Sequence, residues 1–394
     1  MTDSDEIKKI ADQLAKKPIL LSIGLMSGTS MDGIDVALLK TDGVGKAELL
    51  ATREYSYEAP FRSRLAESLE LAKSVGKDRK LPAALVELES EITLRHAKAV
   101  KQFLADANLA SQNLDVIGFH GQTVLHRPDK GFTVQLGDGQ LLADKTGIAC
   151  IYDMRSNDMA YGGQGAPLVP VFHQALAAGL DEPYKSKLPI AFVNIGGISN
   201  ISYIGTNGEL IAFDTGPGNA LIDQWVQTEG GIPFDQGGAI AAEGGVIQQI
   251  AQTYLAESFF EQTIPKSLDR NDFKPPASGS ASLEDGARTL AHISAVAIIK
   301  ACDHLPEAPK LWIICGGGRK NPAIMDDLKK LASKENGAKV VPAEEVGLNG
   351  DSMEAEAWAY LAVLSLKKLP LTFPMTTGCK VPVSGGKLAL PKSK

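Results

Sequence analysis

The chain has 394 residues, of which 44% are hydrophobic and 22% charged, and its formal net charge at pH 7 is −7. This length predicts two domains, and the negative charge argues against nucleic acid or an anionic membrane surface as a partner. No apolar run approaches the ~20 residues of a membrane span, and the acidic start of the chain lacks a signal-peptide core. The four cysteines are scattered and form no CxxC pair. We therefore expect a cytoplasmic enzyme with reduced thiols and no structural zinc.

A polar turn between two apolar runs is the first feature that predicts chemistry. The runs cover residues 19–25 and 34–39, and the segment that joins them contains Gly28, Thr29, Ser30, Met31, Asp32 and Gly33, followed by Ile34 and Asp35. Glycine allows close backbone approach, hydroxyls supply short donors, and the carboxylates could hold water on Mg²⁺. The turn therefore predicts a phosphate-binding site, although an ordinary surface hairpin ending in Asp-Gly has the same pattern.

Two further polar segments follow in the same half of the chain. A buried strand at 115–119 leads into His120, Gln122 and Thr123, and the carboxyl end of such a strand is where α/β proteins place ligand contacts. A packed structural histidine is the alternative for His120. The loop at 153–167 carries Arg155, Gln164 and Gly165, whose donors could hold sugar hydroxyls or a carboxylate. The alternative for this loop is a flexible linker.

The polar stretch 181–187 predicts a domain boundary, which gives a first domain of residues 1–186 and a second of residues 187–351. The second domain begins as the first does, with apolar runs at 188–195, 201–204 and 210–213 separated by short turns. Its first turn contains Asn194, Gly196 and Gly197. This repetition predicts a duplicated architecture in which each half presents a turn that cups a phosphate.

Candidate catalytic and nucleotide contacts follow in the second domain. Asp214 stands after the third apolar run, and we assign it a chemical role because Thr-Gly-Pro-Gly separates it from the next helix. For Asn219, capping of that helix and a functional role are equally compatible with the sequence. The strand at 311–315 is followed by Gly316, Gly317, Gly318 and Asn321. These glycines would let the backbone lie against a nucleobase or ribose. A helix at 352–366 follows, and we expect residues 352–394 to pack back on the first domain.

Taken together, seven motifs resemble those of the anhydro-N-acetylmuramic acid kinase family in the actin/hexokinase/Hsp70 ATPase superfamily. They occupy residues 24–35, 119–123, 162–170, 194–200, 213–219, 315–322 and 350–355. The resemblance covers about residues 22–380. It implies an α/β, two-domain, actin/hexokinase-like fold, made of two ribonuclease-H-like units with the active site in an interdomain cleft.

The resemblance also implies an activity. The family opens the 1,6-anhydro ring of 1,6-anhydro-N-acetylmuramic acid with water and phosphorylates O6 with ATP, giving N-acetylmuramate 6-phosphate and ADP in peptidoglycan recycling. The family's general base corresponds to Asp214. The expected ATP contacts are Gly28 to Asp35 (Gly28, Thr29, Ser30, Met31, Asp32, Gly33, Ile34, Asp35), Asn194, Gly196, Gly197, Gly316, Gly317, Gly318 and Asn321. The expected sugar contacts are His120, Gln122, Thr123, Arg155, Gln164, Gly165, Asn219 and Glu354.

The expected cofactors are ATP and Mg²⁺. The superfamily places an acidic residue in its first strand, whereas residues 24–26 are apolar here. We therefore expect ATP phosphates and water to hold Mg²⁺, with Asp32 or Asp35 nearby. The expected partner is a small sugar, with no nucleic acid and no membrane, and the family implies a homodimer in the cytoplasm.

Two other functions compete with this interpretation. The first is levoglucosan kinase, which acts on 1,6-anhydroglucose, but the Gly-Gly-Gln-Gly-Ala-Pro motif at 162–167 favours the muramic sugar. The second is a non-catalytic, nucleotide-gated binding protein on the same fold. Such a protein would be expected to have lost Asp214, His120 or Asn194, and all three are present.

Overall fold

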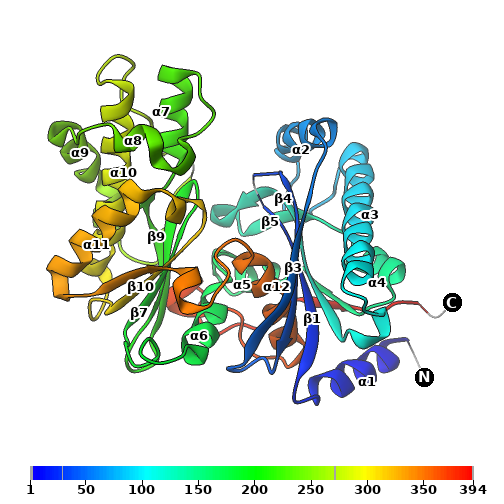
Figure 1. The fold of residues 1–394 in the computed structure, drawn as a ribbon. Helices are drawn as coiled ribbons and strands as arrows, with labels where there is room; N and C mark the ends of the chain where they lie inside the picture. The colour runs from blue at the N-terminus through cyan, green and yellow to red at the C-terminus, as the bar shows by residue number, and fades with distance from the viewer. Residues whose placement is uncertain (1–2, 29, 270–271, 393–394) are drawn as a thin grey trace. The chain divides into compact units, whose positions relative to one another are not determined.

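The computed structural model describes residues 3–28, 30–269 and 272–392 (Figure 1). The chain divides into two compact units, of which the first joins Met1–Gly179 to Ser352–Lys394 and the second is Leu180–Asp351. The chain thus leaves the first unit after Gly179, a few residues before the boundary expected at 186, and returns to it at Ser352. In the part of the chain that the structure describes, no helix is long and apolar enough to cross a membrane.

The first unit is built on one mixed sheet. Its strands are β1 (Leu20–Ser27), β2 (Gly33–Thr41), β3 (Ala47–Ser56), β4 (Val116–Arg127), β5 (Phe132–Leu136), β6 (Cys150–Tyr152) and β12 (Lys387–Ala389). The strand order is β12-β6-β4-β1-β2-β3, and β5 pairs with β4. Strands β1, β2 and β3 form an antiparallel meander, whereas β4 runs parallel to β1 and to β6. The sheet therefore changes from antiparallel to parallel at β1.

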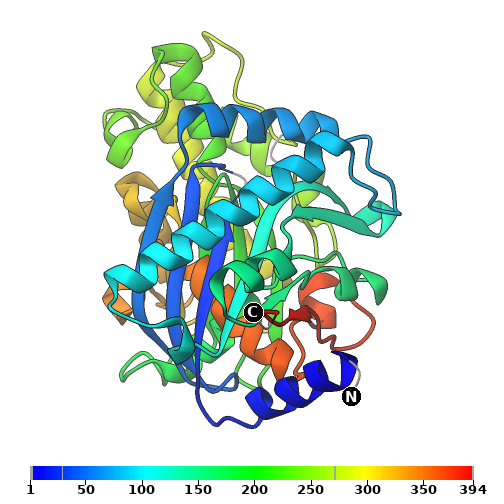
Figure 2. The same ribbon diagram turned by 90° about the vertical axis from the view of Figure 1, so that its right-hand side faces the viewer.

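The first unit also contains helices, several of which pack on this sheet. They are α1 (Asp3–Ala15), α2 (Ala59–Ala72), α3 (Ala83–Asp106), α4 (Gly139–Thr146), α5 (Ser156–Ala160), α6 (Pro170–Gly179), α12 (Met353–Leu366) and α13 (Pro374–Thr377). Helix α3 crosses the strands diagonally (Figure 2), and its apolar side shares a core with α2 and the sheet. Helix α12 lies so close to β1 and β4 that a Cβ on Gly24 would stand 1.8 Å from the Ala355 carbonyl oxygen, and one on Gly118 2.0 Å from that of Trp358. Only glycine allows this approach.

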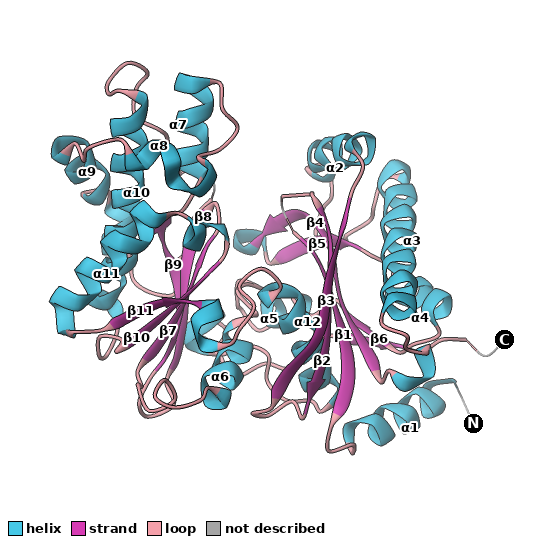
Figure 3. Cartoon of the chain, viewed as in Figure 1, coloured by secondary structure: helices cyan, strands magenta, loops and turns pink. Residues whose placement is uncertain are grey.

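The second unit repeats this plan. Its strands are β7 (Ile190–Ile195), β8 (Ile198–Ile204), β9 (Leu210–Pro217), β10 (Leu311–Cys315) and β11 (Lys339–Pro342), in the order β11-β10-β7-β8-β9 (Figure 3). Its helices are α7 (Ala220–Gly230), α8 (Ala239–Ala242), α9 (Gln248–Leu255), α10 (Leu283–Lys300) and α11 (Pro322–Asn336). Strands β7, β8 and β9 are antiparallel, and β10 runs parallel to β7 and β11.

The two sheets therefore share one topology. Each has a three-strand antiparallel meander whose first strand also pairs with a parallel strand, and a further parallel strand continues the sheet. Strands β1, β2, β3, β4 and β6 correspond in this order to β7, β8, β9, β10 and β11. The predicted α/β fold with two ribonuclease-H-like units is confirmed.

Four predicted element boundaries are wrong. The predicted strand at 115–119 is the first half of β4, which continues through His120 to Arg127 because Gly121 adopts a left-handed φ of 73° and lets the strand bend. Strand β9 likewise runs to Pro217, so Asp214 lies within a strand and not at its end. The apolar pattern of residues 246–260 predicts an amphipathic helix, but α9 covers only Gln248–Leu255 and a 3₁₀ turn follows at Ser258–Glu261. Residues 283–305 are predicted to form one long helix, but α10 ends at Lys300, where another 3₁₀ turn begins.

Candidate active site

The phosphate turn predicted in the first unit connects β1 to β2. Met31 donates its N–H to the Gly28 carbonyl over 3.2 Å, and Met31 itself has a left-handed φ of 55°. The Ser30 hydroxyl donates to Asp32 Oδ1 over 2.8 Å. The Asp32 carbonyl accepts the Tyr57 N–H over 2.7 Å, which ties the turn to the end of β3. Thr29 lies outside the described residues. The turn is therefore shaped by short local hydrogen bonds, as a backbone cradle for an anion requires.

Gln122 supports this turn from β4. Its side chain is fully buried, Oε1 accepts the Ser27 hydroxyl over 2.7 Å, and Nε2 donates to the Gly28 carbonyl over 3.0 Å. The Ser27 hydroxyl also lies 3.1 Å from that of Tyr57, whose pKa burial raises to about 12. Both ends of the Gln122 amide are thus engaged at the start of the phosphate turn.

The carboxylates near the turn suit a magnesium ion that arrives with a nucleotide. Asp32 is exposed, and the half-buried Asp35 pairs with Met26 across β1 and β2. Within the described residues, no three His, Cys, Asp or Glu side chains gather into a metal site. Because Mg²⁺ usually keeps several waters and binds through one or two carboxylates and substrate phosphates, the residues fit that mode of binding.

Arg155 and four other predicted sugar contacts form one cluster in the first unit. Arg155 donates from Nη2 to His120 Nε2 over 3.1 Å and from Nη1 to the Gly165 carbonyl over 2.7 Å. The Thr123 hydroxyl lies 3.4 Å from the same His120 nitrogen. Burial lowers the pKa of Arg155 to about 10, although the charges of Glu354 and Asp158 raise it. The guanidinium is therefore charged at neutral pH and fixed by the protein on two sides.

Trp358 forms one wall of this cluster. The His120 ring lies 4.7 Å from the Trp358 ring, and the Arg155 guanidinium carbon lies 5.4 Å from it. Trp358 lies in the helix predicted at 352–366, but the sequence gave no sign of these partners. Among the described residues, the buried Nε of Arg155 has no hydrogen-bond partner. A donor left over in a polar cluster is a position from which a ligand oxygen can be bound.

A buried carboxylate organises the glycine-rich loop, and sequence reasoning missed its role. Asp158 accepts the Gly165 N–H over 2.7 Å, the Thr372 hydroxyl over 2.6 Å and the Thr377 hydroxyl over 2.7 Å. The Gln164 N–H in turn donates to the Thr377 carbonyl over 2.8 Å. The loop is therefore pinned to the C-terminal segment and is not the flexible linker that the sequence left open.

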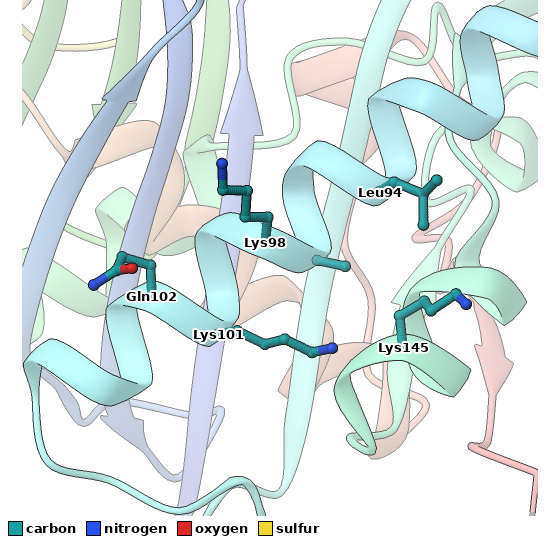
Figure 4. Close-up of a pocket in the computed structure, with 6 residues that line it drawn as sticks. Leu94, Lys98, Lys101, Gln102 and Lys145 are labelled. Carbon is teal, nitrogen blue, oxygen red and sulfur yellow. The ribbon is translucent and has the colours of Figure 1, made fainter.

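Two hollows open on the first unit. One, of about 180 Å³, lies beside His120 and is lined by residues that include Arg79, Glu89, Gln135 and Asp153. The other, of about 370 Å³, lies between α3 and α4 (Figure 4), and Leu94, Ala97, Lys98, Lys101, Gln102 and Lys145 line it. The first hollow contains a predicted site residue, whereas the second contains none.

In the second unit, the turn after β7 packs against the turn after β10. The Gly196 and Gly197 carbonyls accept N–H groups from Asn219 and Ala220 over 2.7 and 3.2 Å. A Cβ on Gly316, whose φ is 72°, would stand 2.3 Å from Asn194 Oδ1. A Cβ on Gly318 would stand 2.2 Å from Ile195 Cγ2. The glycines therefore allow the two predicted nucleotide turns to lie in direct contact.

The two asparagines of this region behave differently. Asn219 occupies the N-cap of α7, but its side chain does not cap the helix and instead donates to the Ile195 carbonyl over 3.3 Å. The capping alternative for Asn219 is therefore wrong. The Asn321 side chain accepts the Ala323 N–H over 3.0 Å and does cap α11. A Cβ on Gly317 would stand 3.6 Å from Nδ2 of Asn219.

Asp214, the predicted base, projects from β9 opposite Asn200 on β8. Its N–H donates to the Lys266 carbonyl over 3.0 Å, and its Oδ2 accepts the Leu268 N–H over 2.8 Å. Burial raises the pKa of Asp214 to about 6, although the Leu268 hydrogen bond lowers it. A carboxylate with this pKa is ionised at neutral pH and still basic enough to take a proton from water.

Comparison with known proteins gives the chain its family. The model of the anhydro-N-acetylmuramic acid kinase family matches residues 20–390. The chain belongs to the anhydro-N-acetylmuramic acid kinase family. The member from Rhizobium etli is 55% identical over 94% of this chain and 98% of its own length, and that from Agrobacterium fabrum is 54% identical over 93% and 98%. Among solved structures, component A of (R)-2-hydroxyglutaryl-CoA dehydratase from Acidaminococcus fermentans has a TM-score of 0.46 at 11% identity and covers 89% of this chain and 100% of its own.

Proposed function

We propose that this member of the anhydro-N-acetylmuramic acid kinase family acts on 1,6-anhydro-N-acetylmuramic acid, ATP and water. The products are N-acetylmuramate 6-phosphate and ADP, and the reaction serves the recycling of peptidoglycan. The observation that carries the proposal is the environment of Asp214, whose carboxylate is held by Leu268 and whose pKa of about 6 suits a general base. We also propose that the enzyme is a cytoplasmic homodimer.

The chemistry explains why a water-activating base is needed. In the anhydro sugar, O6 is bonded to C1, so there is no free 6-hydroxyl to phosphorylate. Asp214 takes a proton from water, and the water oxygen attacks C1 while the C1–O6 bond breaks. The released O6 takes the γ-phosphoryl group, ADP leaves, and the proton remains on Asp214 until it exchanges with solvent. Proton transfer by a positioned carboxylate accelerates a reaction by roughly 10²–10⁴-fold.

ATP recognition is assigned to the glycine turns. The turn from Gly28 to Asp35 and the turn at Asn194, Gly196 and Gly197 would hold the phosphates, and Gly316 to Gly318 would lie against the adenosine. Mg²⁺ would neutralise phosphate charge, with Asp32 or Asp35 holding its waters. The buried amide of Gln122 supports a bracing role beneath the phosphate turn in place of direct sugar contact. Asn321 caps α11 and so fixes the end of the turn at Gly316 to Gly318, which supports an indirect role for Asn321 in adenosine binding.

Sugar recognition is assigned to the cluster around Arg155. Its unpartnered Nε suits an oxygen of the sugar or of its lactyl carboxylate. His120, Thr123, Gly165 and Glu354 share this cluster, and Gln164 stands next to it in the loop that Asp158 pins. Asn219 would contact the sugar from the second unit.

A coupled assay of ADP release tests the proposal. The protein is incubated with ATP, Mg²⁺ and either 1,6-anhydro-N-acetylmuramic acid, levoglucosan or free N-acetylmuramic acid. We expect turnover with the first sugar only. Turnover with levoglucosan instead would replace the muramic substrate by the alternative anhydro sugar. Turnover with the free sugar would overturn the coupled ring opening, and ADP release that ignores the sugar would overturn the kinase assignment.

A further inference from the structure

A buried lysine lies two residues before the group that holds Asp214. Lys266 is only 7% exposed, and its ammonium donates to the carbonyl oxygens of Phe259 and Phe260, each over 3.1 Å. His304 Nε2 lies 3.1 Å from the ammonium and 2.9 Å from the Phe260 carbonyl oxygen, to which it donates. Lysine is seldom buried without an anion, and among the ion pairs of the described residues none involves Lys266. The ammonium is therefore held by backbone carbonyls, and an imidazole lies beside it.

The surroundings of the ammonium are largely aromatic. Its nitrogen lies 4.5 Å from the Phe259 ring and 6.0 Å from the Phe213 ring. Burial lowers the pKa of Lys266, and the charged groups that act on it are Glu261 and Asp303, which raise that pKa, and Lys300, which lowers it. Carbonyl oxygens and ring faces both favour a cation, so the charge is compensated without a carboxylate.

The main chain at Lys266 reaches Asp214 directly. The Lys266 carbonyl accepts the Asp214 N–H over 3.0 Å, and two residues later the Leu268 N–H donates to Oδ2 of Asp214 over 2.8 Å. Residues 266–269 have neither helical nor strand structure, so no regular hydrogen-bond ladder sets their path. The lysine side chain ties this segment to the 3₁₀ turn at Ser258–Glu261 by hydrogen bonds, and Leu268 packs against Phe259 and Phe260 of the same turn.

We propose that Lys266 is a positioning residue for Asp214: its ammonium fixes residues 266–268, and the Leu268 N–H thereby orients the carboxylate toward the reacting water. The inference rests on the proposed function, because it gives Asp214 the role of base. Lys266 itself does not touch the reacting atoms. When one carboxylate oxygen is held by Leu268, the direction of the other is set as well.

We expect the loss of Lys266 to change the rate of the chemical step and the pH dependence of that rate. Loss of the ammonium would loosen the segment and weaken the Leu268 hydrogen bond. Since that bond lowers the pKa of Asp214, the pKa would rise. Within the part of the chain that the structure describes, burial and the Leu268 N–H are what shift the pKa of Asp214. The acidic limb of the kcat profile would therefore move to higher pH.

The test is a pH profile of kcat for Lys266→Met, with Lys300→Met as the matched control. Lys300 also lies near the Phe260 ring, at 5.8 Å, but pairs with the exposed Asp303. We expect Lys266→Met to lower kcat by roughly 10²-fold, with the KM for ATP unchanged and the acidic limb moved up in pH. Lys300→Met should retain the wild-type profile. An unchanged acidic limb in a folded Lys266→Met protein would overturn the proposal.

A second variant covers the case in which Lys266→Met does not fold. His304→Leu keeps the lysine but removes the imidazole that lies 3.1 Å from its ammonium and donates to the Phe260 carbonyl, so the acidic limb should shift in the same direction by a smaller amount. An unshifted limb in this variant also contradicts the proposal. Asp214→Asn separates the two hypotheses, because turnover by that variant would remove Asp214 as the base. If Asp214→Asn is inactive while the acidic limbs of the kcat profiles of Lys266→Met and His304→Leu match that of the wild type, only the role of Lys266 is overturned.

Discussion

Arg155 donates a 3.1 Å hydrogen bond to Nε2 of His120, and this contact settles which ring nitrogen carries the proton. A guanidinium can only donate, so Nε2 must accept, and the neutral imidazole bears its hydrogen on Nδ1. Burial, and then the positive charge of Arg155, hold the pKa of His120 well below its ordinary value. His120 is therefore neutral at pH 7, with its hydrogen on Nδ1.

Substitution of Arg155 should affect the sugar and not the nucleotide. In Arg155→Lys the charge remains, but one ammonium cannot reproduce the fork that reaches His120 and Gly165. We expect the KM for the sugar to rise roughly 10- to 100-fold, as the loss of charge-assisted hydrogen bonds predicts, with the KM for ATP unchanged. Steady-state kinetics with Arg64→Lys as the control checks this, since Arg64 pairs with Glu91 on the surface. An equal rise in both KM values would contradict the assignment.

Substitution of Gln122 by alanine should affect the nucleotide and not the sugar. The substitution leaves the Ser27 hydroxyl and the Gly28 carbonyl without their amide partner, at a cost of roughly 1–3 kcal/mol for buried polar groups. We expect weaker ATP binding by calorimetry and a KM for the sugar near that of the wild type. Gln102→Ala, on the exposed face of α3, serves as the control. A selective loss of sugar affinity would instead make Gln122 a sugar contact.

The raised pKa of Asp214 should also appear in the stability of the protein. The pKa is about 6 in the folded state against an ordinary 3.8, so between these values the folded state holds more protons than the unfolded state. Stability therefore falls as pH rises through this window. Asp214→Asn removes the ionised group, so its Tm should exceed that of the wild type at pH 7 and match it near pH 4. Thermal unfolding at both pH values checks this, and the exposed Asp129→Asn should change neither.

The contact between β1 and α12 makes a prediction about folding. Gly24→Ala would place a methyl group 1.8 Å from the Ala355 carbonyl oxygen, whereas a Cβ on Gly45 meets nothing within 4 Å. Overpacking of this kind typically costs about 1–3 kcal/mol or more. Urea titrations should show a clear loss of stability for Gly24→Ala and almost none for Gly45→Ala. Equal midpoints would mean that α12 moves away from β1 at little cost.

Much of the fold could be predicted because its strands are continuous apolar runs bounded by glycine turns. The positions of β1, β2 and β7 follow from such runs, and so does the repetition of one topology in both units. The extension of β4 past His120 could not be predicted from the sequence. A glycine such as Gly121 usually indicates the end of a strand, whereas here it is the point at which the strand bends. A single glycine in a polar tetrad does not distinguish these outcomes.

The candidate site was predictable to the extent that its residues stand in local motifs. The gathering of His120, Thr123, Arg155, Gly165 and Glu354 joins segments far apart in the chain, and the sequence indicated only that each was polar and near a turn. The roles of Asp158 and Lys266 depend on partners from other elements, which no local pattern encodes. Buried charged groups that support a site are therefore harder to find from sequence than the residues they support.

The discontinuity of the first unit has a consequence for how the chain acquires its structure on the ribosome. Helix α12, which covers β1 and β4, belongs to the first unit but is made after all of Leu180–Asp351. The first sheet must wait with one apolar face uncovered until this helix emerges, whereas the second unit is continuous and can complete its core earlier. The usual order of vectorial folding, in which N-terminal domains finish first, is thus reversed. During synthesis, the first unit is therefore the part of the chain that depends longest on protection by chaperones.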